Sequence, residues 1–418
     1  MTIGWLIVTI HARTLIKGAA AASLVLLAAA CGEDVVAPAV CPEYCPTARL
    51  VVVDTILLGS IENDSSYSDY VLRHRAKRMQ IALDDTVVSN GVFRFQEFEE
   101  EIIIGDLNLS GPVVAVDSFR LQFFLSRRSE TTEATEIAVH RLPVSVDSTT
   151  TYAELEPYFE DSARVATLDL PDSVTGGTVS AILPGDAFPT LIEDSLVSSV
   201  GLAYRSAQAG FADIITSDST FLATILIRYA QVDSIGEAVV PGSDTVLVDF
   251  DTFVSSVSPV ADVNTLTVGG SPANRSLIRT NVPTQIVDSS NVVRATLILV
   301  PSEPTTGITG DALVIVAEAL SIDVGAKSPI VSLPSEVEGL GIVAIPAGWS
   351  DTVRVEVTHL VRAWKAGTSL PRTISLRTIP EGGSLSYARF QSSRSAIGMP
   401  SLQVSYVPPV IVQFEGGR

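Results

Sequence analysis

Alternating apolar and polar residues recur along most of this chain and predict β-strands. In residues 353–357 valine occupies every second position, with Arg354 and Glu356 between the valines. The same alternation occurs in residues 244–250, 294–300 and 401–406. A period of two places one face of a strand in the core and the other in water. Because Gly, Pro, Asp and Ser interrupt such runs about every ten residues, the pattern predicts an all-β fold of antiparallel strands.

The strand pattern also repeats once along the chain. Residues 118–125 resemble 294–301, and residues 136–141 resemble 312–317, so both pairs are 176 positions apart. Further segments match in the same order, namely 162–168 with 352–358, 202–205 with 374–377 and 225–229 with 402–406. We therefore expect two tandem antiparallel β-sandwich domains with a jelly-roll-like topology. One large β structure with unrelated strands is the alternative.

The first thirty residues have the features of an export signal. Arg13 and Lys17 precede an uncharged run of small and apolar residues at 18–30, which ends directly before Cys31. A positive segment, a short apolar segment and small residues before a cleavage site define a secretory signal. The run is too short for a membrane-spanning helix, which needs about 20 apolar residues. An ordinary cleaved signal is the alternative, although it does not require a cysteine at this position.

The segment Leu27-Ala28-Ala29-Ala30-Cys31 resembles the lipobox of bacterial lipoproteins. That resemblance implies cleavage before Cys31, acylation of the mature chain there by fatty acids such as palmitate, and attachment to a membrane. Gly32 follows the cysteine, where the family's inner-membrane retention signal usually has Asp. The resemblance therefore implies an exported protein, at the outer membrane or cell surface if the organism has an outer membrane.

A tether is expected between the anchor and the folded part. Two cysteines remain after lipidation, Cys41 and Cys45, and an exported compartment permits a disulfide between them. A zinc site needs further ligands, and the sequence offers no other cysteine and only widely separated histidines. Strand-breaking residues near 231–242 indicate a boundary. The expected order is a signal peptide (1–30), a lipidated tether (31–47), a first β-sandwich (48–232), a second β-sandwich (233–412) and a tail (413–418).

The charge balance limits the ligands. The formal net charge is −20, and removal of residues 1–30 takes away Arg13 and Lys17 but no acid. Such a surface repels nucleic acid, so no nucleic-acid partner is expected. Asp249 and Asp251 are two positions apart on one strand face, so they could hold a structural Ca²⁺ together with Asp244. Solvated charges at a strand edge are the alternative; no other cofactor is expected.

Ordered segments in the second half carry a second resemblance. They are Asp251-Thr-Phe-Val-Ser-Ser, Thr265-Leu-Thr-Val-Gly-Gly270, Asn274-Arg-Ser-Leu-Ile-Arg279, Arg294-Ala-Thr-Leu-Ile-Leu299, Val357-Thr-His-Leu-Val-Arg-Ala-Trp364, Phe390-Gln-Ser-Ser393 and Pro400-Ser-Leu-Gln-Val-Ser-Tyr406. Their order over residues 244–407 is similar to the bacterial extracellular DNRLRE-type domain. The resemblance implies a jelly-roll-like β-sandwich of a kind often grouped with carbohydrate-binding modules. The first half lacks the Arg-Ser-Leu-Ile-Arg and Val-x-x-Leu-Val-x-x-Trp segments.

Two tryptophans have different expected roles. A short helix with one apolar face is predicted by the spacing of Val357, Leu360, Val361 and Trp364. Trp364 is therefore expected in the core between the sheets. Trp349 lies in the turn-rich segment 346–351 and is the candidate for stacking on a sugar ring; packing under its own loop is the alternative.

Two groups of arginines stand out in an acidic chain. Arg73, Arg75 and Arg78 form the one basic cluster, which could hold an anionic polysaccharide or an acidic partner. A solvent-facing charged strand or a counter-charge to the acidic surface is the alternative. The second half contains scattered arginines, of which we expect some to pair with carboxylates: Arg275, Arg279, Arg377, Arg389 and Arg394.

No catalytic residues are predicted. A nucleophile needs a base beside it, and no Gly-x-Ser-x-Gly segment is present. His140 and Tyr204 are residue types that polysaccharide lyases use, but nothing in their spacing joins them, and His359 is expected to face outward. The sequence predicts a lipid-anchored, non-catalytic cell-envelope protein that binds polysaccharide. A structural or adhesion protein with an envelope or extracellular protein partner is the alternative, and a polysaccharide-active enzyme is the least favoured.

Overall fold

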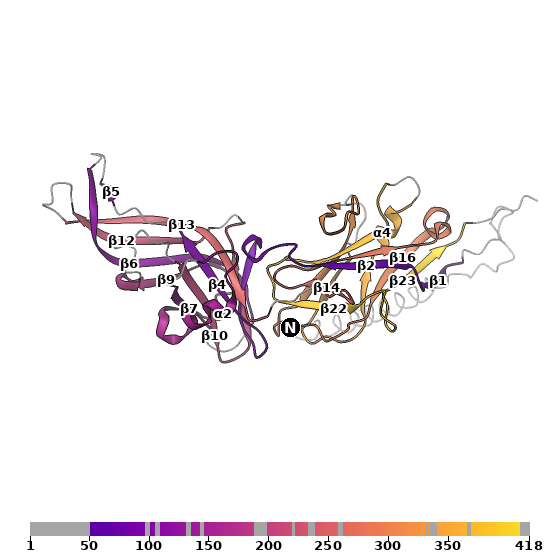
Figure 1. Cartoon of the computed structure of the whole chain (residues 1–418), viewed down its shortest axis with the longest axis horizontal. Helices are drawn as coiled ribbons and strands as arrows, with labels where there is room; N and C mark the ends of the chain where they lie inside the picture. The colour runs from indigo at the N-terminus through magenta and orange to yellow at the C-terminus, as the bar shows by residue number, and fades with distance from the viewer. Residues whose placement is uncertain are drawn as a thin grey trace, which may run out of the picture. The chain divides into compact units, whose positions relative to one another are not determined.

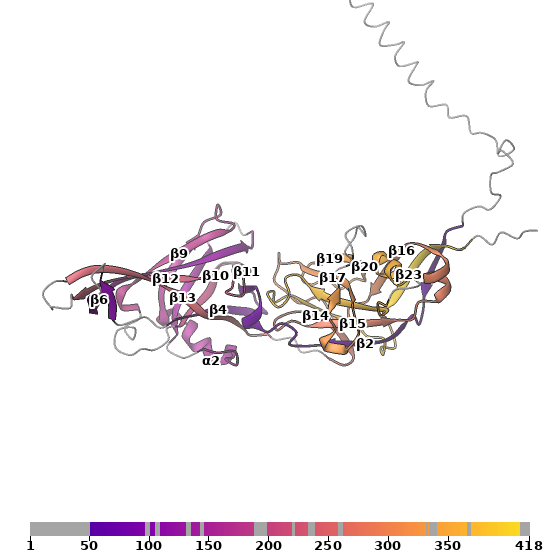
Figure 2. The same ribbon diagram turned by 90° about the horizontal axis from the view of Figure 1, so that it is seen from above.

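The computed structural model describes residues 51–96, 101–104, 109–130, 135–142, 146–187, 199–219, 222–232, 239–257, 262–331, 333, 341–365 and 369–409. They belong to one compact unit, Val51–Arg418. Strands predominate in them and form several antiparallel sheets (Figures 1 and 2). The predicted all-β, antiparallel class is confirmed at this level.

The first half builds a sheet in which six strands close a ring. Their order is β13–β12–β6–β11–β3–β4, and β4 pairs back with β13. The bounds are β3 (Arg78–Leu83), β4 (Val88–Phe95), β6 (Leu109–Arg128), β11 (Gly210–Ile215), β12 (Thr224–Val232) and β13 (Val239–Ser255). We call this part the barrel lobe. A closed ring differs from the pair of separate sheets expected of a β-sandwich.

Two long strands make the closure possible. β13 pairs with β12 over residues 239–247 and with β4 over residues 248–255. β6 likewise pairs with β12 over residues 113–122 and then with β11 near residues 125–128. Register shifts interrupt these pairings, for example between Val248 and Phe250. Because a β-bulge bends a strand and increases its twist, each long strand can belong to two parts of the ring.

The remaining strands of the barrel lobe extend the sheet beyond the ring. β10 pairs with β4, β7 with β10 and β8 with β7, while β5 and β9 pair with β6. Their bounds are β5 (Glu101–Ile104), β7 (Thr135–Leu142), β8 (Arg164–Leu170), β9 (Gly177–Pro184) and β10 (Ser199–Ser206). The short helices of the lobe are η2 (Arg73–Arg75), α2 (Tyr152–Leu155), η4 (Glu156–Phe159), η5 (Asp161–Ala163) and η6 (Gly185–Ala187).

Two larger sheets and one two-stranded sheet form the second lobe. One sheet has the order β1–β23–β16–β20, and the other β18–β17–β21–β15–β2 with β19 paired to β17; β14 pairs with β22. The bounds are β1 (Val53–Leu57), β2 (Ile61–Tyr67), β14 (Thr265–Gly269), β15 (Arg275–Thr280), β16 (Asn291–Leu299), β17 (Leu313–Leu320), β18 (Ile330–Val331), β19 (Gly341–Ile345), β20 (Val353–Glu356), β21 (Thr373–Thr378), β22 (Tyr387–Gln391) and β23 (Ser401–Val407). Short helices are η7 (Gln285–Ser289), η8 (Gly325–Lys327) and α4 (Thr358–Ala363).

One hydrophobic core lies between the sheets of the second lobe. On β20, Val353 and Val355 are buried and Arg354 is exposed, as the alternation predicts. α4 brings Leu360 and Val361 into the same core, and Trp364 is 3% exposed there. The predicted helix and the core position of Trp364 are therefore confirmed.

Strand pairing does not follow the division expected at residues 232 and 233. β1 and β2 come from the start of the chain but pair with β23 and β15 of the second lobe. β13 lies beyond residue 233 but belongs to the ring. Pairing depends on which strand edges are free in the folded chain, so a segment can join a sheet far from it in sequence.

The expected repeat recurs in two strand pairings. β6 and β16 pair with β12 and β23 in the same register, since Leu121 faces Ile225 and Leu297 faces Leu402. β7 with β10 corresponds to β17 with β21. The third correspondence fails, because β8 pairs with β7 whereas β20 pairs with β16. The two lobes therefore contain two equivalent strand pairings, but their sheets as a whole differ.

Candidate functional site

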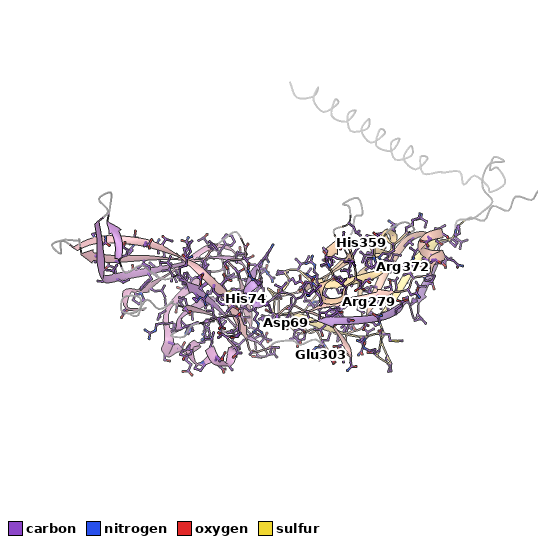
Figure 3. All side chains as sticks on the ribbon, turned by 45° about the horizontal axis from the view of Figure 1, so that its top comes forward. Asp69, His74, Arg279, Glu303, His359 and Arg372 are labelled. Atoms are coloured by element: carbon purple, nitrogen blue, oxygen red, sulfur yellow. The ribbon has the colours of Figure 1, made fainter. Side chains whose placement is uncertain are left out.

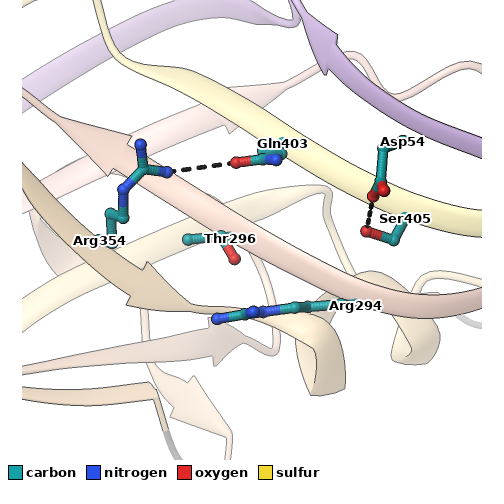
Figure 4. Close-up of a pocket in the computed structure, with 6 residues that line it drawn as sticks. All are labelled: Asp54, Arg294, Thr296, Arg354, Gln403 and Ser405. Atoms are coloured by element: carbon teal, nitrogen blue, oxygen red, sulfur yellow. Dashed lines mark hydrogen bonds between the residues drawn. The ribbon is translucent and has the colours of Figure 1, made fainter.

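A polar groove lies on the four-stranded sheet of the second lobe. Its volume is about 530 Å³. Each strand of the sheet contributes at least one of its lining residues, which are Asp54, Arg294, Thr296, Arg354, Gln403 and Ser405 (Figure 4). We call this surface the polar groove.

Strand alternation places these side chains together. On β23, Leu402 and Val404 are buried, so Gln403 and Ser405 point to the other face. Gln403 faces Thr296 on β16, and Ser405 faces both Arg294 and Asp54 across the ladder. The groove is thus the outward face of strands whose inward face builds the core.

Hydrogen bonds fix the orientation of the groove side chains. Arg354 Nη1 donates to Gln403 Oε1 at 3.2 Å, and the Ser405 hydroxyl donates to Asp54 (Figure 4). Arg294 pairs with Glu356 at 3.0 Å. Burial alone would raise the pKa of Glu356, but hydrogen bonds from Thr358 and Arg294 outweigh it and lower that pKa. Two arginines and two carboxylates therefore leave this face without net charge.

The predicted lipidation site, Cys31, and the predicted disulfide residues, Cys41 and Cys45, lie outside the described residues. The signal peptide and the tether do so too. Among the helices that the structure describes, none has the length and apolar character to cross a membrane.

The ring of Trp349 is partly accessible. The residue is 38% exposed in the segment that joins β19 to β20. Its carbonyl accepts a hydrogen bond from the backbone N–H of Thr305 at 2.9 Å, which joins this loop to the segment around Thr305. Trp349 does not line the polar groove.

The basic cluster separates into three different environments. Arg73 in η2 donates to the carbonyl of Ser271 at 3.1 Å, and burial lowers its pKa although Asp69 opposes this. Arg75 is largely exposed and pairs with Asp218 at 3.4 Å. Arg78 begins β3 and lines a separate cavity. The three guanidinium groups thus do not form one anion-binding surface.

The three aspartates proposed for Ca²⁺ do not converge. Asp249 lies at the register shift of β13 and pairs with Arg94 at 2.8 Å, whereas Asp251 is 1% exposed. The bulge changes the face on which the following residues lie, so the expectation that Asp249 and Asp251 share a face is wrong. Asp244 accepts a hydrogen bond from the N–H of Thr245. In the described residues no group of three or more His, Cys, Asp or Glu is arranged to hold a metal ion.

The residues considered for catalysis are buried and separate. His140 faces Gly201 across the strand pair and packs edge-on against Phe159 with ring centroids 5.4 Å apart. Tyr204, three positions after Gly201, belongs to the opposite face and shares a hydrogen bond with Ser129. His359 is 4% exposed in α4 (Figure 3), so its predicted outward position is wrong. The short helix packs against β16, and the backbone of Ala317 on β17 lies beside the His359 imidazole.

The five second-half arginines for which pairing was considered all pair with carboxylates, as expected for some of them. The pairs are Arg275–Glu381, Arg279–Asp323, Arg377–Glu318, Arg389–Glu303 and Arg394–Asp64. The hydrogen bond from Arg279 (Figure 3) lowers the pKa of Asp323. These guanidinium groups are therefore already paired within the lobe.

The structure contains a buried polar cluster that the sequence pattern did not predict. Arg127 on β6 bridges Asp213 on β11 and Asp311, with 2.6 Å to each carboxylate. The Gln80 amide on β3 donates to the same two carboxylates at 3.0 and 2.9 Å. Burial raises the pKa of Asp213 to about 6, although Arg127 opposes the shift.

Two members of the cluster, Gln80 and Asp213, left a weak trace in the sequence. Gln80 lies between Met79 and Ile81, and Asp213 lies between Ala212 and Ile214, so each polar residue occurs within an apolar strand. Such a residue needs a buried partner. The partner of Gln80 is Asp213 on β11, which is far away in sequence, so no local pattern identifies it.

No protein-family model matches this chain, and no curated protein matches it either. The chemistry of the polar groove therefore rests on its own residues.

Proposed function

We propose that this chain is an exported, lipid-anchored and non-catalytic protein that binds polysaccharide through the polar groove. The observation that carries the proposal is a groove of about 530 Å³ lined by side chains that donate and accept hydrogen bonds. Its volume lies in the usual range of ligand sites, about 300–1,000 Å³. Sugar hydroxyls need such alternating donors and acceptors.

The charge of the groove favours an uncharged glycan. Arg294 is paired with Glu356, and Arg354 donates to the amide of Gln403. A neutral face does not repel a neutral sugar chain and gives no excess attraction to an acidic one. Arg354 and Gln403 form a donor and acceptor pair that a glycan hydroxyl can join.

We also propose that the second lobe is a jelly-roll-like β-sandwich of the DNRLRE type. In support, its two larger sheets enclose one hydrophobic core, and the segment around Val357 and Trp364 forms the helix α4 beside it.

The anchor is tested separately from the ligand. Cys31→Ser removes the acylated thiol, so the protein is expected to move from the membrane fraction to the soluble fraction after cell fractionation. Cys41→Ser is the matched control, because it removes a cysteine that is not the proposed anchor and is expected to stay in the membrane fraction. Unchanged membrane association of Cys31→Ser would refute lipidation.

A glycan array tests the groove. The chain is screened as wild type, as Arg354→Ala and Gln403→Ala in the groove, and as Arg120→Ala on an exposed position of β6. We expect binding to a neutral glycan that both groove variants weaken and Arg120→Ala does not. If Trp349→Ala loses glycan binding and the groove variants keep it, the binding site lies at the Trp349 loop instead of the polar groove. Absence of binding to every glycan would overturn the proposal.

A protein partner is the second candidate. Arg394 donates to the carbonyl of Val263, and the segment that follows Arg394 carries Ile397 and Met399. These three apolar side chains are 76%, 84% and 51% exposed. An exposed apolar patch is typical of a protein interaction site. Binding of an extracellular protein that Ile397→Ser abolishes, with no glycan binding, would favour this candidate.

A further inference from the structure

A second cavity, of about 190 Å³, lies beside the buried polar cluster. Its lining includes the polar residues Arg78, Arg127, Asp311, Thr378 and Ser384 and the apolar residues Ile379 and Pro380. It shares no residue with the polar groove. We call it the Arg78 cavity.

One side of the Arg78 cavity is made of groups that are already paired. Asp311 receives hydrogen bonds from Arg127 at 2.6 Å, from Gln80 at 2.9 Å and from Ser384 at 3.1 Å. Arg127 in turn holds Asp213 at 2.6 Å. A carboxylate with several donors and a guanidinium with two carboxylates have little capacity left for a ligand.

Arg78 differs from these neighbours. Within the part of the chain that the structure describes, its guanidinium forms no ion pair and no hydrogen bond. The other two members of the basic cluster are engaged, since Arg73 binds the Ser271 carbonyl and Arg75 binds Asp218. In a chain with a net charge of −20, an unpaired guanidinium at the wall of a cavity is an unused site for an anion.

We propose that the Arg78 cavity binds one small organic carboxylate, held by the Arg78 guanidinium. The planar fork of arginine matches a carboxylate with two parallel hydrogen bonds. Ile379 and Pro380 offer an apolar wall for the carbon skeleton of the ligand. The cavity is smaller than the sites that hold drug-sized ligands, so its ligand has the size of a single sugar acid or a short-chain acid.

Isothermal titration of the full chain tests this proposal. The probes are D-glucuronate and butyrate, which share a carboxylate, with D-glucose as the neutral counterpart and sulfate as an inorganic anion. The wild type is expected to bind at least one carboxylate and not glucose. Arg78→Met is expected to weaken that binding at least about tenfold, which corresponds to the loss of a charged hydrogen-bonded pair.

Matched variants separate a binding role from a structural one. Arg120→Gln removes an exposed arginine on β6 and is expected to leave carboxylate binding unchanged. Arg78→Lys keeps the charge without the fork of two parallel donors, so it should bind the carboxylate with intermediate strength. If Arg78→Met fails to fold, Arg78→Lys still tests the role of the Arg78 guanidinium. Equal binding by wild type and the Arg78 variants, no binding of either carboxylate, or equal affinity for sulfate would each overturn the proposal. None of these outcomes depends on glycan binding in the polar groove.

Discussion

At the residue scale, three buried ionisable groups contribute to the response of stability to pH. Burial raises the pKa of Asp213 and of Asp251 to about 6, and it lowers the pKa of His140 to about 4. The aspartates contribute stability that is complete below their unfolded pKa of 3.8 and is lost as the pH rises through about 6. His140 acts in the opposite direction, since its contribution is present above pH 6.5 and is lost as the pH falls towards 4.

Asp213→Asn isolates one of these contributions. Asparagine resembles the protonated carboxyl, so the variant and the wild type should differ little in their pH response below pH 4. Above pH 6 the wild type holds a buried charge that the variant lacks. The stability of the variant relative to wild type should therefore rise between pH 4 and pH 7, by about 1–3 kcal/mol at the usual value per pKa unit.

Urea unfolding at several pH values measures this difference. Asp249→Asn is the control, because it removes an exposed carboxylate of the same lobe instead of a buried one. A constant difference between Asp213→Asn and wild type across the range would contradict the assigned pKa shift.

The two tryptophans of the second lobe should respond differently to truncation. Trp364→Ala leaves a large cavity in a closed core and is expected to cost about 3–5 kcal/mol of unfolding free energy. Trp349→Ala removes a partly exposed ring and should cost about 0.5 kcal/mol or less. Denaturant unfolding of both variants checks the contrast; similar losses would show that Trp349 is also a core residue.

At the element scale, the barrel lobe depends on close contact between strands and short helices. Gly201 on β10 is covered by Phe159 of η4, and a β-carbon at Gly201 would lie 2.6 Å from Phe159 Cε1. That distance is shorter than van der Waals contact. The glycine therefore lets η4 pack directly on the backbone of β10, on the face that also carries His140.

Gly201→Ala is expected to destabilise the barrel lobe through this contact. Overpacking typically costs about 1–3 kcal/mol. Phe159→Leu removes the ring atoms that the new methyl group would meet, so the double variant should be more stable than the sum of the two single losses predicts. A double-mutant cycle in urea measures the coupling. Simple additivity of the two losses would contradict the steric explanation.

At the scale of the whole molecule, the core of the barrel lobe includes residues from the second half of the chain. Ile308 and Leu385 are buried in the same hydrophobic cluster as Phe211 and Ile214 of β11. The backbone N–H of Leu385 also donates to Gln80 at 2.9 Å. The apolar contacts and the polar cluster around Asp311 together join distant segments, so unfolding should be cooperative.

Leu385→Asp tests that cooperativity. Calorimetry of the wild type should show one unfolding transition for the described unit. A carboxylate in the place of Leu385 would be buried without a partner, so the variant should lose these contacts and show two transitions. Leu370→Asp, at a partly buried position of the second lobe core, is the control and should lower stability without separating the transitions. One transition in both variants would contradict the shared core.

Sequence alone determined the features that depend on neighbours in the chain. The valines of β20 and the spacing that ends at Trp364 predicted a strand and a helix correctly, because side-chain direction follows the local period of the backbone. Tertiary structure decided which strands meet. The closure of β4 on β13, the bulge at Asp249 and the meeting of Asp213 with Asp311 all depend on contacts between segments far apart in sequence. The polar groove shows both: alternation turned Arg354 and Gln403 outward, and only strand order placed them side by side.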